Sequence, residues 1–170
     1  MLKRPFLVAL EAPCQSPLVD ALNESAFGPG RFAKTAYRLR EGREGLPELY
    51  FVATDGDVLC GSVRYWPVMI GEAPALLLGP LAVHPERQNQ GIGKALMELS
   101  LKRAAELGHH LVILVGDPPY YARVGFAPVP VGQISLPGPV DPGRIPYKEL
   151  VPGALAAARG EVKPAGRRIA

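Results

Sequence analysis

The hydrophobic and polar positions at the start of the chain predict a buried strand followed by a helix. Residues 6–12 form a short apolar run of the length expected for a strand. Residues 16–27 predict the helix, because Ser16 is a favourable N-cap and Pro17 suits the first helical position. Glycines break this pattern over 28–31, and a short helix or loop is expected to follow.

Three strands come next and predict an antiparallel meander. Residues 48–55, 57–70 and 75–83 are rich in apolar, β-branched and aromatic side chains and are separated by turn residues. Asp55 and Gly56 are a strong signal for a two-residue hairpin turn between the first two of these strands. The middle of the chain is therefore expected to be a sheet of sequential neighbours.

The second half opens with the clearest helical pattern of the chain, over residues 91–107. Its polar side recurs every four residues with alternating charge, at Lys94, Glu98, Lys102 and Glu106. Its expected buried side is formed by Ile92, Ala95, Leu96 and Leu99. The glycine at 108 is a good stop signal.

Shorter elements are expected beyond this helix. Residues 109–116 predict a strand covered on both faces, 118–124 a short helix and 125–129 another strand. Residues 132–144 are expected to be a loop, and 145–155 to hold the last strand and a short helical end. The order predicts an α/β (α+β) fold, with a mixed, mostly antiparallel sheet of about six to seven strands and about four flanking helices.

Composition and charge fit one soluble domain. The chain has 170 residues, of which 48% are hydrophobic and 21% charged. A net charge of +3 is too small to indicate a nucleic-acid partner. We expect a single domain over residues 1–156 and a basic, flexible tail over 157–170.

Cysteine and histidine positions indicate neither a disulfide nor a metal site. Cys14 and Cys60 are expected to be reduced thiols of a cytoplasmic protein. The pair His109 and His110 has no neighbour at metal-ligand spacing, so no metal is expected. No apolar run reaches the length of about 18 residues that a membrane span needs.

The stretch RQNQGIGKAL, residues 87–96, combines two glycines with the start of a helix, which is typical of a phosphate-binding loop. A nucleotide-triphosphate loop would require a glycine at Gln88 and a hydroxyl side chain at Ala95. A dinucleotide-binding loop would require a glycine at Leu96 after a parallel strand. Both alternatives fail on these residues, and a glycine pair alone is better explained by a tight turn.

Two motifs together resemble the GCN5-related N-acetyltransferase (GNAT) family. Residues 88–93 match its loop Q/R-x-x-G-x-G/A, and residues 121–126 match its Y-x-x-x-G-F. The predicted element order is similar to the GNAT fold over nearly the whole chain, and these segments look most like the YhbS-like subgroup. The resemblance implies acetyl-CoA as cosubstrate, without a metal, and an N-acetyltransferase acting on an amine of a small molecule or a protein.

The resemblance also implies which residues bind the cosubstrate. The loop would hold the pyrophosphate through Gln88, Asn89, Gln90, Gly91, Ile92, Gly93, Lys94 and Ala95. Gly79 and Pro80 interrupt the third meander strand, where proline weakens ladder pairing. In the family this strand splays from its neighbour, so the backbone of Leu81, Ala82 and Val83 would bind the pantetheine arm.

Tyr121 is the tyrosine of Y-x-x-x-G-F and the expected general acid, which would protonate the departing thiolate. Tyr120 is expected to contact the cosubstrate or the acceptor, since adjacent helical residues point about 100° apart. Tyr65 and Trp66 are expected to pack on the sheet, with lining of the acceptor pocket left open.

No residue stands out as the general base. Glu48, Glu72, His84 and Asp117 are candidates, and so is a relayed water, because the strand 75–83 has no carboxylate. Asp117 is better explained as a helix cap. The missing carboxylate keeps open a second hypothesis, a non-catalytic acyl-CoA-binding sensor or partner subunit on the same fold. A homodimer through a strand edge also remains open.

Overall fold

The computed structural model describes residues 5–28 and 35–169, so part of the glycine-rich break expected over 28–31 lies outside the described residues. The strands of the described residues are β1 (Leu7–Leu10), β2 (Phe51–Asp55), β3 (Val58–Ile70), β4 (Ala73–Val83), β5 (Leu111–Ile113), β6 (Ala127–Pro128), β7 (Ile134–Ser135), β8 (Pro146–Glu149) and β9 (Gly160–Pro164). They form one sheet in the order β1-β2-β3-β4-β5-β8-β6, with β9 paired to β3 and β7 to β9.

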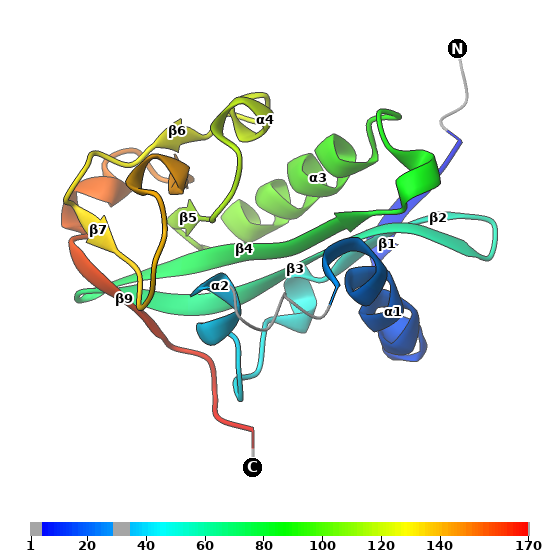
Figure 1. Ribbon diagram of the computed structural model, residues 1–170, viewed down its shortest axis with the longest axis horizontal. Helices are drawn as coiled ribbons and strands as arrows, with labels where there is room; N and C mark the ends of the chain where they lie inside the picture. The colour runs from blue at the N-terminus through cyan, green and yellow to red at the C-terminus, as the bar shows by residue number, and fades with distance from the viewer. Residues whose placement is uncertain (1–4, 29–34, 170) are drawn as a thin grey trace.

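Helices cover both faces of this sheet. The α-helices of the described residues are α1 (Ser16–Phe27), α2 (Thr35–Arg38), α3 (Ile92–Glu106) and α4 (Pro118–Ala122). Short 3-10 turns lie at Pro13–Gln15, Pro47–Leu49, Pro85–Arg87, Pro142–Arg144 and Ala154–Ala157. Figure 1 shows α3 and α4 on one side of the sheet and α1 and α2 on the other. Within the described residues, no helix is both long and apolar enough to cross a membrane.

The predicted meander is confirmed, and the fold class with it. β2 pairs with β3 and β3 with β4 in antiparallel register, and Asp55 pairs with Val58 across the hairpin turn. Gly56 takes a left-handed φ of 58° there, which a glycine adopts without strain. The expected mixed, mostly antiparallel sheet contains parallel pairing only at β4–β5 and β7–β9 among the strands that the structure describes.

Two segments differ from the sequence-based expectation. β7 lies within the expected loop, and β9 lies within the expected flexible tail. β9 pairs with β3 through Met69 and Lys163, and Val162 is only 1% exposed. A buried valine on a paired strand is ordered by contacts, so the expectation of a tail is wrong for residues 160–164.

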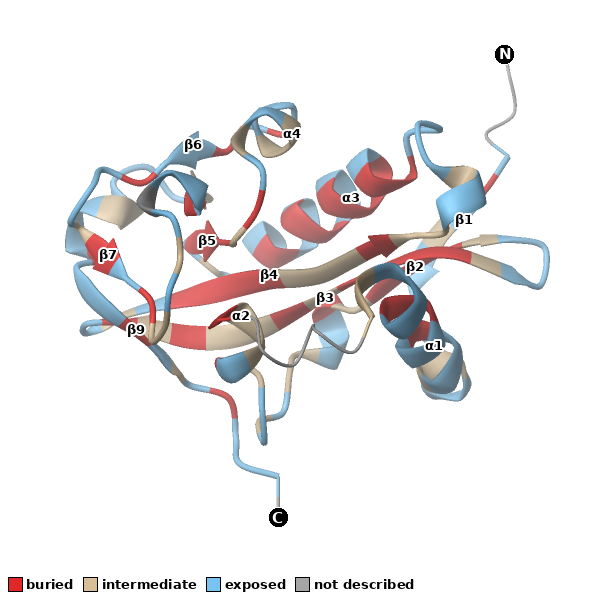
Figure 2. Ribbon diagram, viewed as in Figure 1, coloured by how far each residue is buried: buried red, intermediate tan, exposed pale blue. Residues whose placement is uncertain are grey.

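The core has two clusters of buried residues, one on each face of the sheet. Figure 2 colours the buried residues red along the ribbon. Ile92, Ala95 and Leu96 of α3 are buried as predicted, whereas Leu99 is 39% exposed and the prediction for it is wrong. Ser100 takes the inward position one residue later, where its hydroxyl lies 2.7 Å from the Tyr65 hydroxyl. A buried polar pair thus joins α3 to β3.

Candidate active site

β4 and β5 run side by side over only a short distance. Their parallel pairing is limited to Leu76 with Val112 and Leu77 with Ile113. Beyond Leu77, β4 continues to Val83, while the chain after β5 bonds to the segment around β8, with Leu114 N–H donating to the Pro146 carbonyl. The two strands therefore separate, as the family resemblance implies.

A bulge in β4 lies where this separation begins. Leu78 pairs with Tyr65 of β3 and Leu81 with Val63, so Gly79 and Pro80 together stand opposite the single residue Arg64. Pairing with β3 resumes after the bulge, which confirms an interruption at the predicted position. An extra residue on one strand increases local twist and bends the strand, which turns the end of β4 away from β5.

The end of β4 presents backbone groups to the gap between the strands. The His84 N–H donates to the Cys60 carbonyl at 2.8 Å, which identifies a bonded pair of the antiparallel ladder. Such pairs alternate with non-bonded ones, so Leu81 and Val83 turn their N–H and C=O groups away from β3. Ala82, in contrast, faces Ser62 of β3 and is 3% exposed. The structure therefore brings Leu81 and Val83 to the gap and turns Ala82 from it.

The predicted phosphate loop connects β4 to α3. Asn89 and Gly91 both have left-handed backbones, with φ of 62° and 81°. In anion-binding nests, left-handed residues alternate with right-handed ones and successive N–H groups point to one side, and the positions of Asn89 and Gly91 fit this pattern. α3 begins at Ile92, and no side chain caps its N-terminus. Its first N–H groups have no partner inside the helix, so the loop offers donors and partial positive charge to an anion.

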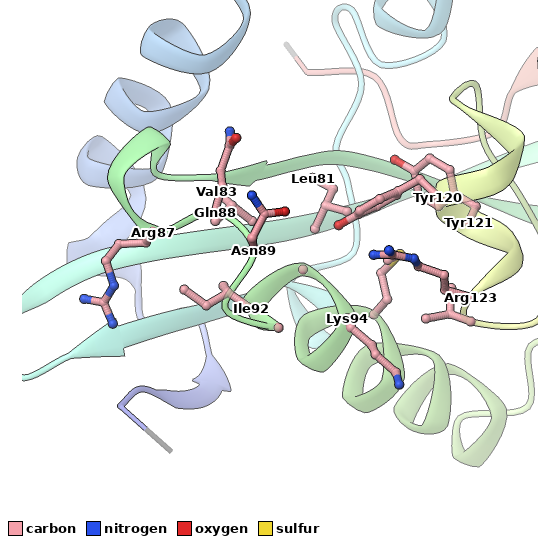
Figure 3. Close-up of a pocket in the computed structure, with 14 residues that line it drawn as sticks. Leu81, Val83, Arg87, Gln88, Asn89, Ile92, Lys94, Tyr120, Tyr121 and Arg123 are labelled. Atoms are coloured by element: carbon pink, nitrogen blue, oxygen red, sulfur yellow. The ribbon is translucent and has the colours of Figure 1, made fainter. Parts of the chain in front are cut away.

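A pocket of about 340 Å³ lies over this loop, between β4, α3 and α4. We call it the loop pocket. Of the predicted site residues, it is lined by Leu81, Val83, Gln88, Asn89, Gly91, Ile92, Gly93, Lys94, Tyr120 and Tyr121. In Figure 3, the rings of Tyr120 and Tyr121 extend from α4 toward Leu81 of β4. Gln90 and Ala95 instead line a smaller cavity of about 200 Å³ beside Phe6, on the other side of the loop.

Close packing explains two glycines near the loop. A side chain at Gly93 would collide with the Tyr120 hydroxyl, which lies against the first turn of α3. A Cβ at Gly61 of β3 would stand 2.8 Å from the Ile92 side chain. Gly61 thus lets α3 approach the sheet, and Gly93 lets Tyr120 reach across the loop pocket. Gly91 has a different role, because a Cβ there would meet no atom within 4 Å but would be strained by the left-handed backbone.

The charged side chains around the loop differ in whether they already have a partner within the protein. Arg87 donates to Asp55 at 3.0 Å and to Gln90 at 2.9 Å, so its guanidinium is already engaged. Lys94 lies 3.8 Å from Glu98 and is 59% exposed, in keeping with its place on the polar stripe of α3. Arg123 lines the loop pocket and raises its positive charge. Arg87, Met97, Arg123 and Val124 are lining residues that the sequence analysis missed.

Tyr121 lies at the end of the loop pocket that faces β5. Its ring makes edge contacts with Tyr120 and Phe126, at centroid distances of 5.0 and 6.0 Å. Gly116, after β5, leaves the space that the ring occupies. Burial is the main reason that the pKa of Tyr121 is raised to about 12, so its phenol is protonated at neutral pH. A neutral phenol is the form that can act as a general acid.

A second pocket, of about 570 Å³, opens on the α1 and α2 side of β4. We call it the arginine pocket, because Arg40, Arg43 and Arg64 line it. Trp66 also lines it, whereas Tyr65 is fully buried against Ser100. The two pockets share Leu81 and Tyr121. The point where they meet therefore lies beside the bulge of β4.

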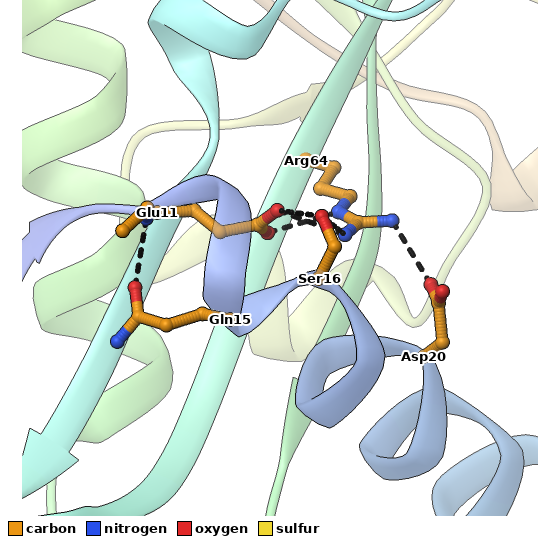
Figure 4. Close-up of polar contacts among 6 residues, drawn as sticks. Glu11, Gln15, Ser16, Asp20 and Arg64 are labelled. Carbon is orange, nitrogen blue, oxygen red and sulfur yellow. Dashed lines mark hydrogen bonds and ion pairs between the residues drawn. The ribbon is translucent and has the colours of Figure 1, made fainter.

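Two residues that line the arginine pocket, Arg64 and Asp20, belong to the ion-pair group drawn in Figure 4. Arg64 donates to both carboxylate oxygens of Glu11, at 3.0 and 2.9 Å, and to Asp20 at 3.2 Å. The Arg64 side chain is 13% exposed and that of Glu11 is 3% exposed. The hydrogen bond and the negative charge of Glu11 counteract desolvation and hold the pKa of Arg64 above its usual value. This arginine is fully compensated by its own chain.

None of the four predicted base candidates lines either pocket. Glu48, Glu72, His84 and Asp117 all lie elsewhere, and the His84 Nδ1 accepts from the Glu86 N–H at 3.2 Å. Asp117 stands at the N-cap of α4 but makes no side-chain cap bond. The carboxylates that line the arginine pocket are those of Asp20 and Glu41, both on exposed residues.

The structure also bears on the histidine pair after α3. His109 is half-buried, and burial lowers its pKa, while His110 is exposed. In the part of the chain that the structure describes, no three His, Cys, Asp or Glu side chains gather as metal ligands would.

Comparisons with known proteins agree with this geometry. Residues 47–128 match the family described as acetyltransferase (GNAT) domain. The chain is 36% identical over 125 residues to the uncharacterized N-acetyltransferase YhbS of Escherichia coli K12, an alignment that covers 71% of this chain and 73% of YhbS.

Solved structures show the same relationship. The crystal structure of YhbS from Escherichia coli in complex with CoA superposes with a TM-score of 0.81 at 28% identity, covering 96% of this chain and 92% of that one. A GNAT acetyltransferase from Brucella melitensis in complex with acetyl-CoA gives a TM-score of 0.61 at 25% identity, covering 86% and 97%. With the strand separation, the loop and the tyrosine pair in place, these similarities show that the chain belongs to the GNAT family of acetyltransferases.

Proposed function

We propose that this acetyltransferase moves the acetyl group of acetyl-CoA directly to an amine in a ternary complex. The observation that carries the proposal is the meeting of two pockets at Leu81 and Tyr121. The cosubstrate would occupy the loop pocket, and the acceptor would enter from the arginine pocket. Neither ligand would then have to leave before the other arrives.

The loop pocket suits a pyrophosphate and an extended arm. The nest at Asn89 and Gly91 and the uncapped start of α3 would hold the two phosphates. The N–H and C=O groups of Leu81 and Val83 that point away from β3 would bind the pantetheine amides, as an exposed sheet edge binds an added strand. YhbS was solved with CoA and the Brucella protein with acetyl-CoA, which supports this choice of ligand.

Tyr121 would complete the transfer as general acid. Bound acetyl-CoA supplies a thioester, whose carbonyl carbon is attacked by the amine nitrogen while the C–S bond breaks. The Tyr121 phenol gives its proton to the sulfur, and its pKa of about 12, raised mainly by burial, means that the phenol also stays protonated well above neutral pH. Tyr120 would position the arm, because its hydroxyl crosses the pocket to Gly93.

The amine must lose a proton, and the site offers no dedicated carboxylate for it. Asp20 forms an ion pair with Arg64 at 3.2 Å, and its side chain is 69% exposed. Glu41 is exposed at the rim of the arginine pocket. We therefore propose that the proton leaves through water in this pocket, with no single strong base.

Initial-rate kinetics tests direct transfer. We expect intersecting double-reciprocal lines when acetyl-CoA and the amine are varied together, and an unmodified protein mass after incubation with acetyl-CoA alone. Parallel lines, or a protein that has gained an acetyl group, would show a covalent intermediate and overturn the proposal.

A further inference from the structure

Of the three arginines that line the arginine pocket, Arg40 and Arg64 have opposite electrostatic surroundings. Arg64 is bonded to Glu11 and Asp20. Arg40 has no carboxylate within ion-pair distance among the residues that the structure describes, and its buried Nε has no hydrogen-bond partner there. One guanidinium is thus compensated by the protein, and the other is not.

Aromatic rings are the partners that Arg40 does have. Its guanidinium carbon lies 5.6 Å from the centre of the Trp66 ring and 6.0 Å from that of Tyr37. Burial lowers the pKa of Arg40, which means that the surroundings disfavour its charge. Cation–π contacts offset only part of the cost of burying a cation, and buried charges are normally paired. The ring faces orient the guanidinium, but they leave its donors unused.

We propose that Arg40 binds a carboxylate of the acceptor, so that the substrates are small amines that carry a carboxylate. This inference rests on the acetyl transfer proposed above and narrows it. The planar fork of a guanidinium matches the two oxygens of a carboxylate. An anion at Arg40 would pair the charge and satisfy the buried Nε together.

The position of Arg40 fits an acceptor that spans the pocket. Its Nη1 approaches Gly79 in the bulge of β4, 4.0 Å from where a Cβ on that glycine would stand. The pocket continues from there past Leu81 to Tyr121. A carboxylate at Arg40 therefore leaves the amine of a small molecule to point toward the reacting end, and a volume of about 570 Å³ suits a ligand of this size.

A second unpaired polar atom lies on the α1 wall of the same pocket. The amide oxygen of Asn23 is buried and has no partner among the described residues, and Asn23 is 8% exposed overall. A buried acceptor without a donor is costly. A donor group of the ligand would satisfy it, so among the described residues this pocket is lined by both an unpaired cation and an unpaired acceptor.

Binding of product analogues tests the inference without requiring turnover. The protein is saturated with CoA and titrated calorimetrically with N-acetyl amino acids and with the N-alkylacetamides that lack only the carboxylate. We expect the carboxylates to bind at least about tenfold more tightly, as for a charge-assisted pair. Arg40→Met should remove this preference, and Arg40→Lys should keep only part of it. Arg103→Met, on the exposed face of α3, should keep the wild-type preference.

Each other outcome overturns the inference. Equal affinity of wild-type protein for both members of each pair, an unchanged preference in Arg40→Met, or no binding by any member would reject a carboxylate at Arg40. If analogues that carry a phosphonate in place of the carboxylate bind more tightly, the group bound at Arg40 is phosphate-like and the carboxylate is rejected. Failure of the transfer itself is measured separately, as absent thiol release from acetyl-CoA, and the wild-type comparison of paired ligands does not depend on how well the variants fold.

Discussion

Leu81 and Tyr121 line both pockets, and within the described residues they are the only two that do so. Leu81 resumes the β3–β4 ladder directly after the bulge, and Tyr121 comes from the short helix after β5. The junction thus takes one residue from β4 and one from the helix that follows β5. This relationship makes the junction the place where thioester and amine would meet.

Removing the phenol at this junction should slow transfer without weakening cosubstrate binding. We expect Tyr121→Phe to lower kcat by on the order of 100-fold, the lower end of what a general acid contributes. The Kd for acetyl-CoA, measured by calorimetry, should change by less than about threefold, equivalent to under about 1 kcal/mol. Tyr147→Phe, on β8 and outside both pockets, is the matched control and should retain wild-type kcat.

The pH dependence of kcat follows from the raised pKa of Tyr121. The acid is competent while protonated, so its contribution is present below the pKa of about 12 and lost as pH rises through it. With saturating amine, kcat should show no fall between about pH 8 and pH 10, whereas an acid with the ordinary tyrosine pKa of about 10 would be half ionised at pH 10. A decline centred below pH 9 in a protein that stays folded would contradict Tyr121 as the acid.

The two loop glycines should respond differently to alanine. Gly93→Ala places a methyl group against the Tyr120 hydroxyl, which should rotate the ring into the loop pocket and weaken acetyl-CoA binding by about tenfold, or about 1.4 kcal/mol. Gly91→Ala meets open space but forces a side chain into a left-handed backbone, at a cost of about 1–2 kcal/mol.

Gly108→Ala is the control for this strain. Gly108 also has a left-handed backbone, with φ of 89°, and open space around it, but it lies at the far end of α3. Calorimetry and denaturant unfolding should show a similar loss of stability for Gly91→Ala and Gly108→Ala, and weaker acetyl-CoA binding for Gly91→Ala alone. Equal binding by both variants would argue against the loop as the phosphate site.

The buried pair of Tyr65 and Ser100 should be asymmetric in its effect on stability. Ser100→Ala leaves the Tyr65 hydroxyl buried without its partner at 2.7 Å, which should cost about 1–3 kcal/mol. Tyr65→Phe should cost less, about 1 kcal/mol, because the Ser100 hydroxyl still has the Met97 carbonyl at 3.2 Å. Urea unfolding of the two variants measures the difference, and the opposite order would show that the pair does not determine how α3 is held.

The C-terminal segment should be needed for stability, contrary to the sequence-based expectation of a flexible tail. Ending the chain at Arg159 removes β9 and exposes the edge of β3 near Ile70, which should lower Tm by several degrees. Ending it at Pro164 keeps β9 and serves as the control. Equal melting temperatures for the two truncations would mean that β9 contributes nothing to the fold.

Elements of the fold with a clear local pattern were predictable from the sequence. The hairpin at Asp55, the long strands of the meander and helix α3 follow from turn residues and periodicity within each segment. β7 and β9 were not predictable, because both are short and depend on pairing between distant parts of the chain. β7 pairs with β9, and β9 pairs with β3. Leu99 was misassigned because the buried stripe of α3 is shifted toward Ser100.

The two pockets also differ in how far the sequence alone predicts them. The loop pocket could be predicted because one contiguous stretch, 87–96, supplies much of its wall and the tyrosine motif lies shortly after. The arginine pocket takes residues from segments as distant as Asp20 and Ile169, which only the folded chain brings together. No motif in the sequence marks Arg40, and its lack of a carboxylate partner among the described residues is visible only in three dimensions.

The most direct test of acetyl transfer to an amine is release of free thiol from acetyl-CoA with a broad panel of amines. Acetyl-CoA should first raise the melting temperature of the protein, which establishes binding. We then predict thiol release that depends on the amine, is greatest with amines that carry a carboxylate, and falls on the order of 100-fold in Tyr121→Phe. A protein that binds acetyl-CoA but releases thiol no faster with any amine than without one would contradict the claim and favour a non-catalytic acyl-CoA-binding role.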